Sequence, residues 1–145
     1  MPEHPQALVG QSVVITGAGR GIGRAIALAY ARAGAAVACS GRSGAEIEET
    51  VAAITGAGGR AMAVRADVGD PAAMQALMRQ AAEQYGGLDM VVANAGVAPK
   101  VGRVEDSDPA VWAQVVQTNL VGAYCTAHAA IPHLRARGGG KILFI

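Results

Sequence analysis

A glycine-rich turn near the N-terminus connects an apolar segment to an alanine-rich one. The apolar segment covers residues 12–15 (SVVI), the turn covers 16–23 (TGAGRGIG) and the alanine-rich segment covers 24–33. Glycine adopts positive φ without strain and lets the backbone approach a ligand, and the first turn of a helix presents unpaired N–H groups to anionic oxygens. The turn therefore predicts a strand and a helix whose junction binds phosphate groups.

The spacing of the glycines distinguishes this turn from two common phosphate-binding motifs. It reads Gly17-x-x-x-Gly21-x-Gly23, so Ile22 stands where the G-x-G-x-x-G fingerprint read from Gly17 would need its third glycine. The Gly-Lys-Ser/Thr ending of a P-loop is also missing from the turn. Taken alone, the turn could be a tight connection without a ligand, and the rest of the chain decides between the two interpretations.

Strand-like and helical segments alternate along the whole chain. Strands are expected at residues 12–15, 35–40, 61–66, 88–93 and 141–145, and helices at 21–33, 44–55, 71–85 and 109–137. Apolar strands joined by helices predict a doubly wound α/β fold, with a parallel sheet and helices on both faces. No linker or repeat divides the chain, so we expect one domain over residues 1–145.

Pro132 is expected to kink or end the last helix near Ile131.

Composition narrows the functional classes. The chain of 145 residues is 52% hydrophobic with one Trp and one Phe, which predicts an aliphatic core, and its net charge of +1 gives no support for a nucleic-acid or anionic-membrane partner. It has no apolar run long enough to span a membrane and no signal-peptide pattern at its start, so we expect a cytoplasmic protein. Cys39, Cys125 and the histidines lack metal-ligand spacing, and no metal site is expected.

The turn and the alternation of segments resemble the classical short-chain dehydrogenase/reductase family, whose phosphate-binding turn has the form Thr-Gly-x-x-x-Gly-x-Gly. The resemblance covers the whole chain as the amino-terminal part of such an enzyme, and it implies a Rossmann-like sheet that binds a nicotinamide dinucleotide. Asp67 and Val68 match the place where the family's Asp accepts a hydrogen bond from the adenine amino group and the next residue packs on the ring. Because Asp70 before Pro71 is the better helix N-cap, Asp67 is left free for the cofactor.

A second match follows the fourth strand. Residues 93–96 (ANAG) resemble the family's Asn-Asn-Ala-Gly motif, with Ala93 in place of the first Asn. In the family this segment stabilises the central sheet and lines the nicotinamide ribose. The residues expected to bind the cofactor are therefore Gly17, Gly19, Arg20, Gly21, Ile22, Gly23, Arg42, Asp67, Val68, Asn94, Ala95 and Gly96.

The end of the second strand is expected to select the cofactor. Gly41 stands at the usual Asp position of NAD-preferring members, Arg42 follows it, and no carboxylate is expected there to repel a 2′-phosphate. Arg20 matches a basic residue of many NADP-preferring members, and a guanidinium binds phosphate bidentately. These residues favour NADP. NAD stays the alternative, because Arg42 could be a solvated loop charge and some NAD-dependent members also carry the equivalent of Arg20.

The resemblance also indicates which catalytic residues of the family are matched in these 145 residues and which are not. Asn119, in the segment QTNLVG, matches the Asn that holds a water connecting a catalytic lysine to solvent in the family; the alternative is an amide bonded to the helix backbone. The family's catalytic Ser and Tyr-x-x-x-Lys pair follow the fifth strand, and no match to them is present. We therefore expect a fold truncated after the fifth strand and a chain that is inactive alone.

Two functional classes remain open from the sequence. The first is an oxidoreductase that transfers hydride between NADP(H) and a small-molecule carbonyl or secondary alcohol, with this chain supplying the cofactor-binding half. The second is a non-catalytic dinucleotide-binding module or an inactive fragment. In the family, the helix matching residues 109–137 forms much of a subunit interface, so the full-length protein is expected to be a homo-oligomer. The substrate itself is not predicted.

Overall fold

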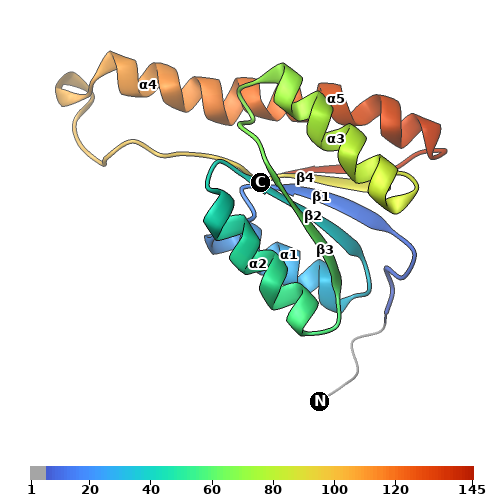
Figure 1. The fold of residues 1–145 in the computed structure, drawn as a ribbon. Helices are drawn as coiled ribbons and strands as arrows, with labels where there is room; N and C mark the ends of the chain where they lie inside the picture. The colour runs from blue at the N-terminus through green and yellow to red at the C-terminus, as the bar shows by residue number, and fades with distance from the viewer. Residues whose placement is uncertain (1–5) are drawn as a thin grey trace.

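Five parallel strands form one sheet in the computed structural model, which describes residues 6–145 (Figure 1). The strands are β1 (Ser12–Thr16), β2 (Ala36–Gly41), β3 (Arg60–Arg65), β4 (Met90–Ala93) and β5 (Lys141–Phe144). Their order is β3-β2-β1-β4-β5, and each adjacent pair is parallel. The chain builds outward from β1 on one side and then crosses back to place β4 on the other. The order therefore reverses between β1 and β4, where doubly wound folds bind ligands.

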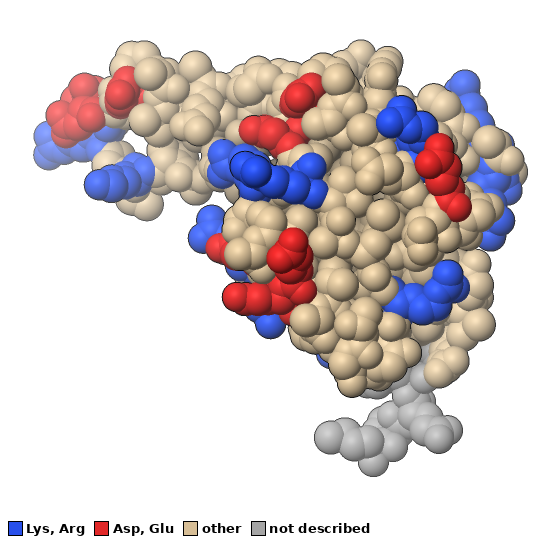
Figure 2. Space-filling view, in the orientation of Figure 1, with Lys and Arg blue, Asp and Glu red and all other residues tan. Residues whose placement is uncertain are grey.

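Helices cover both faces of the sheet, as the sequence predicted. In Figure 1, α1 (Gly21–Arg32) and α2 (Gly44–Gly56) lie on one face, and α3 (Pro71–Tyr85) and α5 (Gly122–Ala136) lie on the other. A short 3-10 turn (Val104–Asp106) leads into α4 (Pro109–Val116), which continues through a π-helical segment (Gln117–Val121) into α5. The α4 helix projects beyond the sheet (Figure 2). Within residues 6–145, no helix combines the length and apolarity needed to cross a membrane.

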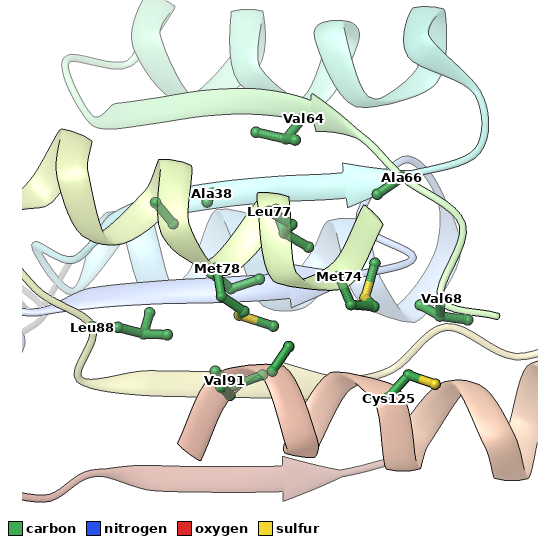
Figure 3. Close-up of a cluster of buried hydrophobic side chains, with 14 of the residues drawn as sticks. Ala38, Val64, Ala66, Val68, Met74, Leu77, Met78, Leu88, Val91 and Cys125 are labelled. Atoms are coloured by element: carbon green, nitrogen blue, oxygen red, sulfur yellow. The ribbon is translucent and has the colours of Figure 1, made fainter. Parts of the chain in front are cut away.

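The two faces of the sheet bury two separate cores. Alternate residues of a strand point to opposite faces, so Val13 and Ile15 pack toward α1 and α2 while Val14 packs toward α3 and α5. On the second face, Met74 of α3 and Val91 of β4 lie in one aliphatic cluster with α5 (Figure 3). Burial on both faces explains why these strands are continuous apolar runs rather than alternating ones.

Pro132 does not end the last helix, so of the two expected outcomes, a kink or an end near Ile131, the end is wrong. The α5 helix continues to Ala136. Proline removes one backbone donor, which frees the carbonyl of His128, and both residues lie on the exposed side of the helix, away from the core. Ala130 and Leu134 on the opposite side are buried against the core and hold the helix in place.

Asp89 joins the start of β4 to β1 and to the end of α5. Its Oδ2 accepts a hydrogen bond of 2.8 Å from the backbone N–H of Ser12, and its Oδ1 accepts one of 2.9 Å from Nε of Arg137. Burial alone raises the pKa of Asp89, but the hydrogen bonds from Arg137 and Ser12 and the charge of Arg137 outweigh it. The pKa of the carboxyl group therefore lies below its ordinary value of 3.8.

The depressed pKa of Asp89 predicts an acid-dependent contribution to stability. The ionised carboxylate stabilises the fold above the unfolded-state pKa, and this contribution is lost as the pH falls from about 4 through the folded-state pKa. We expect Asp89→Asn to be less stable than the wild type near neutral pH and to lose less stability on acidification. Urea unfolding at a series of pH values, followed by circular dichroism, measures the stability near neutral pH and its loss on acidification. Parallel acid profiles for the two proteins would contradict this assignment.

Candidate functional site

The glycine turn and the carboxyl ends of the strands enclose a pocket of about 650 Å³. It lies where the strand order reverses, beside β1. All the residues predicted to bind the cofactor line this pocket. They are Gly17, Gly19, Arg20, Gly21, Ile22, Gly23, Arg42, Asp67, Val68, Asn94, Ala95 and Gly96. The fold thus brings together segments that are up to about eighty residues apart in the sequence, because parallel strands end at the same edge of a sheet.

Glycines in the turn meet two different structural needs. Gly17 and Gly21 have φ of +65° and +53°, a region that residues with a Cβ adopt only with strain. Gly23 has no such φ, but a Cβ there would collide with the carbonyl oxygen of Gly17 and lie 2.5 Å from Nδ2 of Asn94. The helix therefore packs closely against the turn at Gly23. Isoleucine is tolerated at position 22, where the G-x-G-x-x-G fingerprint has its third glycine, because Ile22 is 65% exposed.

The N-terminus of α1 lacks a side-chain cap. Arg20 occupies the N-cap position without making a capping hydrogen bond, and the first turn has no acidic residue. In contrast, Ser43, Asp70 and Asp108 cap α2, α3 and α4 with hydrogen bonds to backbone N–H groups. The N–H groups of its first turn and the positive end of the helix dipole make the α1 N-terminus suited to hold an anion at the pocket.

Asn94 fixes the turn to the end of β4. Its Nδ2 donates hydrogen bonds to the backbone carbonyls of Thr16 at 3.0 Å and Gly17 at 3.3 Å. In return, Oγ1 of Thr16 accepts hydrogen bonds from the backbone N–H groups of Asn94 at 3.0 Å and Ala95 at 3.1 Å. The sequence analysis assigned no separate role to the Thr16 hydroxyl, although its place at the end of β1 and the head of the turn was the available signal.

Asp70 caps α3, as predicted from the position of Pro71, and Asp67 does not. Oδ1 of Asp70 accepts hydrogen bonds from the N–H groups of Ala72 and Ala73 and caps α3. Oδ1 of Asp67 accepts a hydrogen bond of 2.9 Å from Gly69, which closes a short turn at the pocket wall. Among residues 6–145, its Oδ2 has no hydrogen-bond partner and is available to a ligand.

Charged side chains of both signs line the pocket near the start of α2. Arg20 and Arg42 are exposed, and neither forms an ion pair with any residue in the described range. Glu46 also lines the pocket, and a Cβ built on Gly19 would lie 3.2 Å from its Oε2. The expectation that no carboxylate is available here is wrong, because the first turn of α2 brings Glu46 back beside the glycine turn.

Asn119 lies in the π-helical segment and contacts a smaller pocket of about 140 Å³. Its Oδ1 accepts a hydrogen bond of 2.8 Å from the backbone N–H of Val97, and its Nδ2 donates one of 2.9 Å to the Val97 carbonyl. The amide therefore holds the loop after β4 rather than its own helix. The water-relay role stays a prediction, and the π-helical turn, a feature often found at functional sites, was not predicted.

The described residues offer no metal centre and no exposed thiol. Within residues 6–145, no group of three or more His, Cys, Asp or Glu side chains could hold a metal ion. Cys39 and Cys125 are both buried, and burial raises the pKa of the Cys39 thiol to about 12. A thiol with so high a pKa is a poor nucleophile near neutral pH.

The fold and the pocket define an α/β domain with an open site at the uncapped N-terminus of α1. The family model described as "short chain dehydrogenase" matches residues 11–145. The chain belongs to the short-chain dehydrogenase family, and this family shares an NAD(P)-binding fold.

Several relatives and solved structures resemble the chain over nearly all of its length. Versicolorin reductase stcU of Emericella nidulans is 42% identical, with 94% of this chain and 51% of that protein covered. Cis-4-hydroxycyclohexanecarboxylate dehydrogenase of Sinomonas cyclohexanicum is 40% identical, with 95% and 55% covered. A 3-ketoacyl-ACP reductase structure from Sinorhizobium meliloti 1021 is 44% identical with a TM-score of 0.87, over 92% of this chain and 52% of that one. The chain spans about half the length of the curated relatives it matches.

Proposed function

We propose that the protein is an oxidoreductase that transfers hydride between NADP(H) and a small-molecule carbonyl or secondary alcohol. Residues 6–145 would supply the cofactor-binding half of the site. The observation that carries this proposal is the single pocket formed by the uncapped α1 N-terminus, the close-packed glycine turn and the ends of β2, β3 and β4. The names of the relatives, which are reductases and dehydrogenases, support the same reaction class.

The residues of the pocket fit a dinucleotide by their chemistry. The N–H groups at the start of α1 would bind the pyrophosphate, and Gly23 keeps the turn close to the helix. The free carboxylate oxygen of Asp67 would accept a hydrogen bond from the adenine amino group, while Val68 and Ala95 would pack against the rings. The bound cofactor supplies the hydride donor or acceptor, and these residues orient it.

The positive charges of Arg20 and Arg42 support NADP as the cofactor, with NAD as the alternative. Both residues line the pocket, Arg20 in the glycine turn and Arg42 directly after β2, and neither is engaged in an ion pair within the described range. Glu46 opposes them, because its carboxylate would repel a 2′-phosphate. We therefore propose that the protein prefers NADP only moderately.

Neutralising Glu46 tests its opposition to the 2′-phosphate. We expect Glu46→Gln to lower the Kd for NADPH about 2- to 5-fold, the size of effect typical of an exposed charge pair, and to leave the Kd for NADH nearly unchanged. Glu48→Gln is the matched control, because Glu48 is exposed on the same helix but does not line the pocket. Equal effects of the two variants on NADPH affinity would show that Glu46 acts only through net charge.

A homo-oligomer is proposed from the apolar surface of the long helix. Trp112, Val116, Leu120 and Tyr124 are 45–67% exposed and follow one another at intervals of four residues. Their spacing places them on one side of the helix, where another subunit would cover them. The size of the protein in solution, measured by light scattering, tests this expectation.

We also propose a cytoplasmic location, on the composition of the sequence.

Hydride transfer is the direct test of the reaction class. We expect carbonyl-dependent oxidation of NADPH by the protein isolated from its native source, with its intact mass measured in the same preparation. Turnover by a protein substantially heavier than the 14.5 kDa of these residues would support the oxidoreductase proposal. A protein of 14.5 kDa that binds NADPH without turnover would instead indicate a non-catalytic dinucleotide-binding module.

A further inference from the structure

A buried hydroxyl group at the edge of the pocket has no hydrogen-bond partner. Ser40, near the carboxyl end of β2, is 1% exposed, and within residues 6–145 its Oγ is the one buried side-chain polar atom without a partner. Buried polar groups without partners destabilise a protein, so those that occur need an explanation. A ligand that supplies the missing partner is one such explanation.

Other buried hydroxyl groups of the protein show the usual pattern. Those of Ser12, Thr16, Thr50 and Thr126 are equally buried, and each makes at least one hydrogen bond to the backbone. Three of them donate to a carbonyl oxygen at 2.7–2.9 Å, and the fourth, Thr16, accepts from two N–H groups. Ser40 therefore differs from every comparable group in the described part of the chain.

The location of Ser40 indicates what could meet its hydroxyl. Ser40 lines the large pocket and lies beside Thr16 in the sheet. Because side chains alternate along a strand, Ser40 faces the same side as Ala38, and this side carries Ala66 and Val68 at the pocket wall after β3 (Figure 3). Its own carbonyl accepts a hydrogen bond of 2.9 Å from Ala18, which fixes β2 against the glycine turn.

We propose that Oγ of Ser40 donates a hydrogen bond to a ring nitrogen of the adenine base of the bound dinucleotide. The inference rests on the proposed function. Charged groups of a dinucleotide belong at the α1 N-terminus and beside the exposed arginines, whereas the wall around Ser40 is built from buried apolar residues. A flat base fits such a wall, and its ring nitrogens are hydrogen-bond acceptors that need a donor.

The proposal predicts opposite effects of Ser40→Ala on stability and on binding. Removing a hydroxyl that has no partner in the free protein leaves Tm unchanged or raises it. Removing the donor to adenine raises the Kd for NADPH about 3- to 10-fold, the loss expected for one hydrogen bond. The Kd for reduced nicotinamide mononucleotide, which lacks adenine, stays the same. Nicotinamide fluorescence and thermal unfolding of the chain measure these quantities.

Ser12→Ala is the matched control. Its hydroxyl donates to the Gly87 carbonyl at 2.8 Å and lies outside the pocket, so we expect a lower Tm and an unchanged Kd for NADPH. An unchanged Kd in Ser40→Ala would overturn the inference, and so would a lower Tm, because it would reveal a partner within the free protein. A folded wild type that binds neither NADPH nor NADH would overturn the proposed function as well. Wild-type binding combined with normal binding by Ser40→Ala would overturn the adenine contact alone.

Discussion

Gly23→Ala is expected to prevent the glycine turn from closing against α1 and to abolish NADPH binding. The new Cβ would collide with the Gly17 carbonyl oxygen and press on Nδ2 of Asn94. These two groups are hydrogen-bonded to each other, and Nδ2 of Asn94 also donates to the Thr16 carbonyl. Overpacking against fixed backbone costs about 3 kcal/mol of stability. With the turn displaced from the helix N-terminus, we expect the Kd for NADPH to rise about 100-fold or more. Urea unfolding and nicotinamide fluorescence measure the two effects.

Gly44→Ala provides the matched control for this substitution. Gly44 is the first residue of α2, and a Cβ there would meet nothing within 4 Å. Alanine at this position should leave NADPH affinity unchanged and stability unchanged or slightly higher, because alanine favours the helix. NADPH affinity of Gly23→Ala within about twofold of the wild type would contradict the role assigned to the turn.

Arg42→Asp is expected to reverse the cofactor preference from NADPH to NADH. The substitution removes a guanidinium that would bind the 2′-phosphate and adds a second carboxylate beside Glu46, while an acidic group at the end of β2 suits the ribose 2′-hydroxyl. We expect the Kd for NADPH to rise about 30-fold or more, as for the loss of one partner of a close charge pair, and the Kd for NADH to stay the same or fall. Titrations with both cofactors measure the reversal.

A control variant with the same change of charge far from the pocket shows whether the effect on cofactor affinity is local or follows from net charge. Arg79 lies on α3, where it pairs with Glu83 at 4.0 Å, and it does not line the pocket. Arg79→Asp changes the net charge equally but should leave the affinity for NADPH and NADH almost unchanged. If Arg42→Asp retained normal NADPH affinity, the 2′-phosphate would have to be bound elsewhere.

The sequence was sufficient for the type and order of most elements. Strands that are buried on both faces of a parallel sheet must be apolar throughout, so runs such as residues 12–15 were recognisable without knowledge of their neighbours. Asp70 before Pro71 correctly located the start of α3. The expected end of the last helix near Ile131 was wrong, because the residues around Pro132 are held in the helix by tertiary packing that the sequence does not reveal.

The position of a site residue was predictable where the residue follows a strand. It was less predictable where the residue reaches the pocket from a helix, because the direction of the helix decides what lies near it. Asn94 follows a buried strand, and the fold brings its side chain to the glycine turn. Glu46 was missed because its proximity to Gly19 depends on the direction in which α2 leaves the sheet. Ser40 was missed for another reason: only the packed structure reveals that its hydroxyl lacks a partner.

Titration of the chain with NADPH and NADH tests whether the pocket binds a nicotinamide dinucleotide. Binding is followed by nicotinamide fluorescence, with circular dichroism and gel filtration on the same sample to establish that the chain is folded. We expect saturable binding of one dinucleotide per chain, tighter for NADPH than for NADH and displaced by 2′,5′-ADP. A folded chain that binds neither cofactor would contradict the assignment of the pocket.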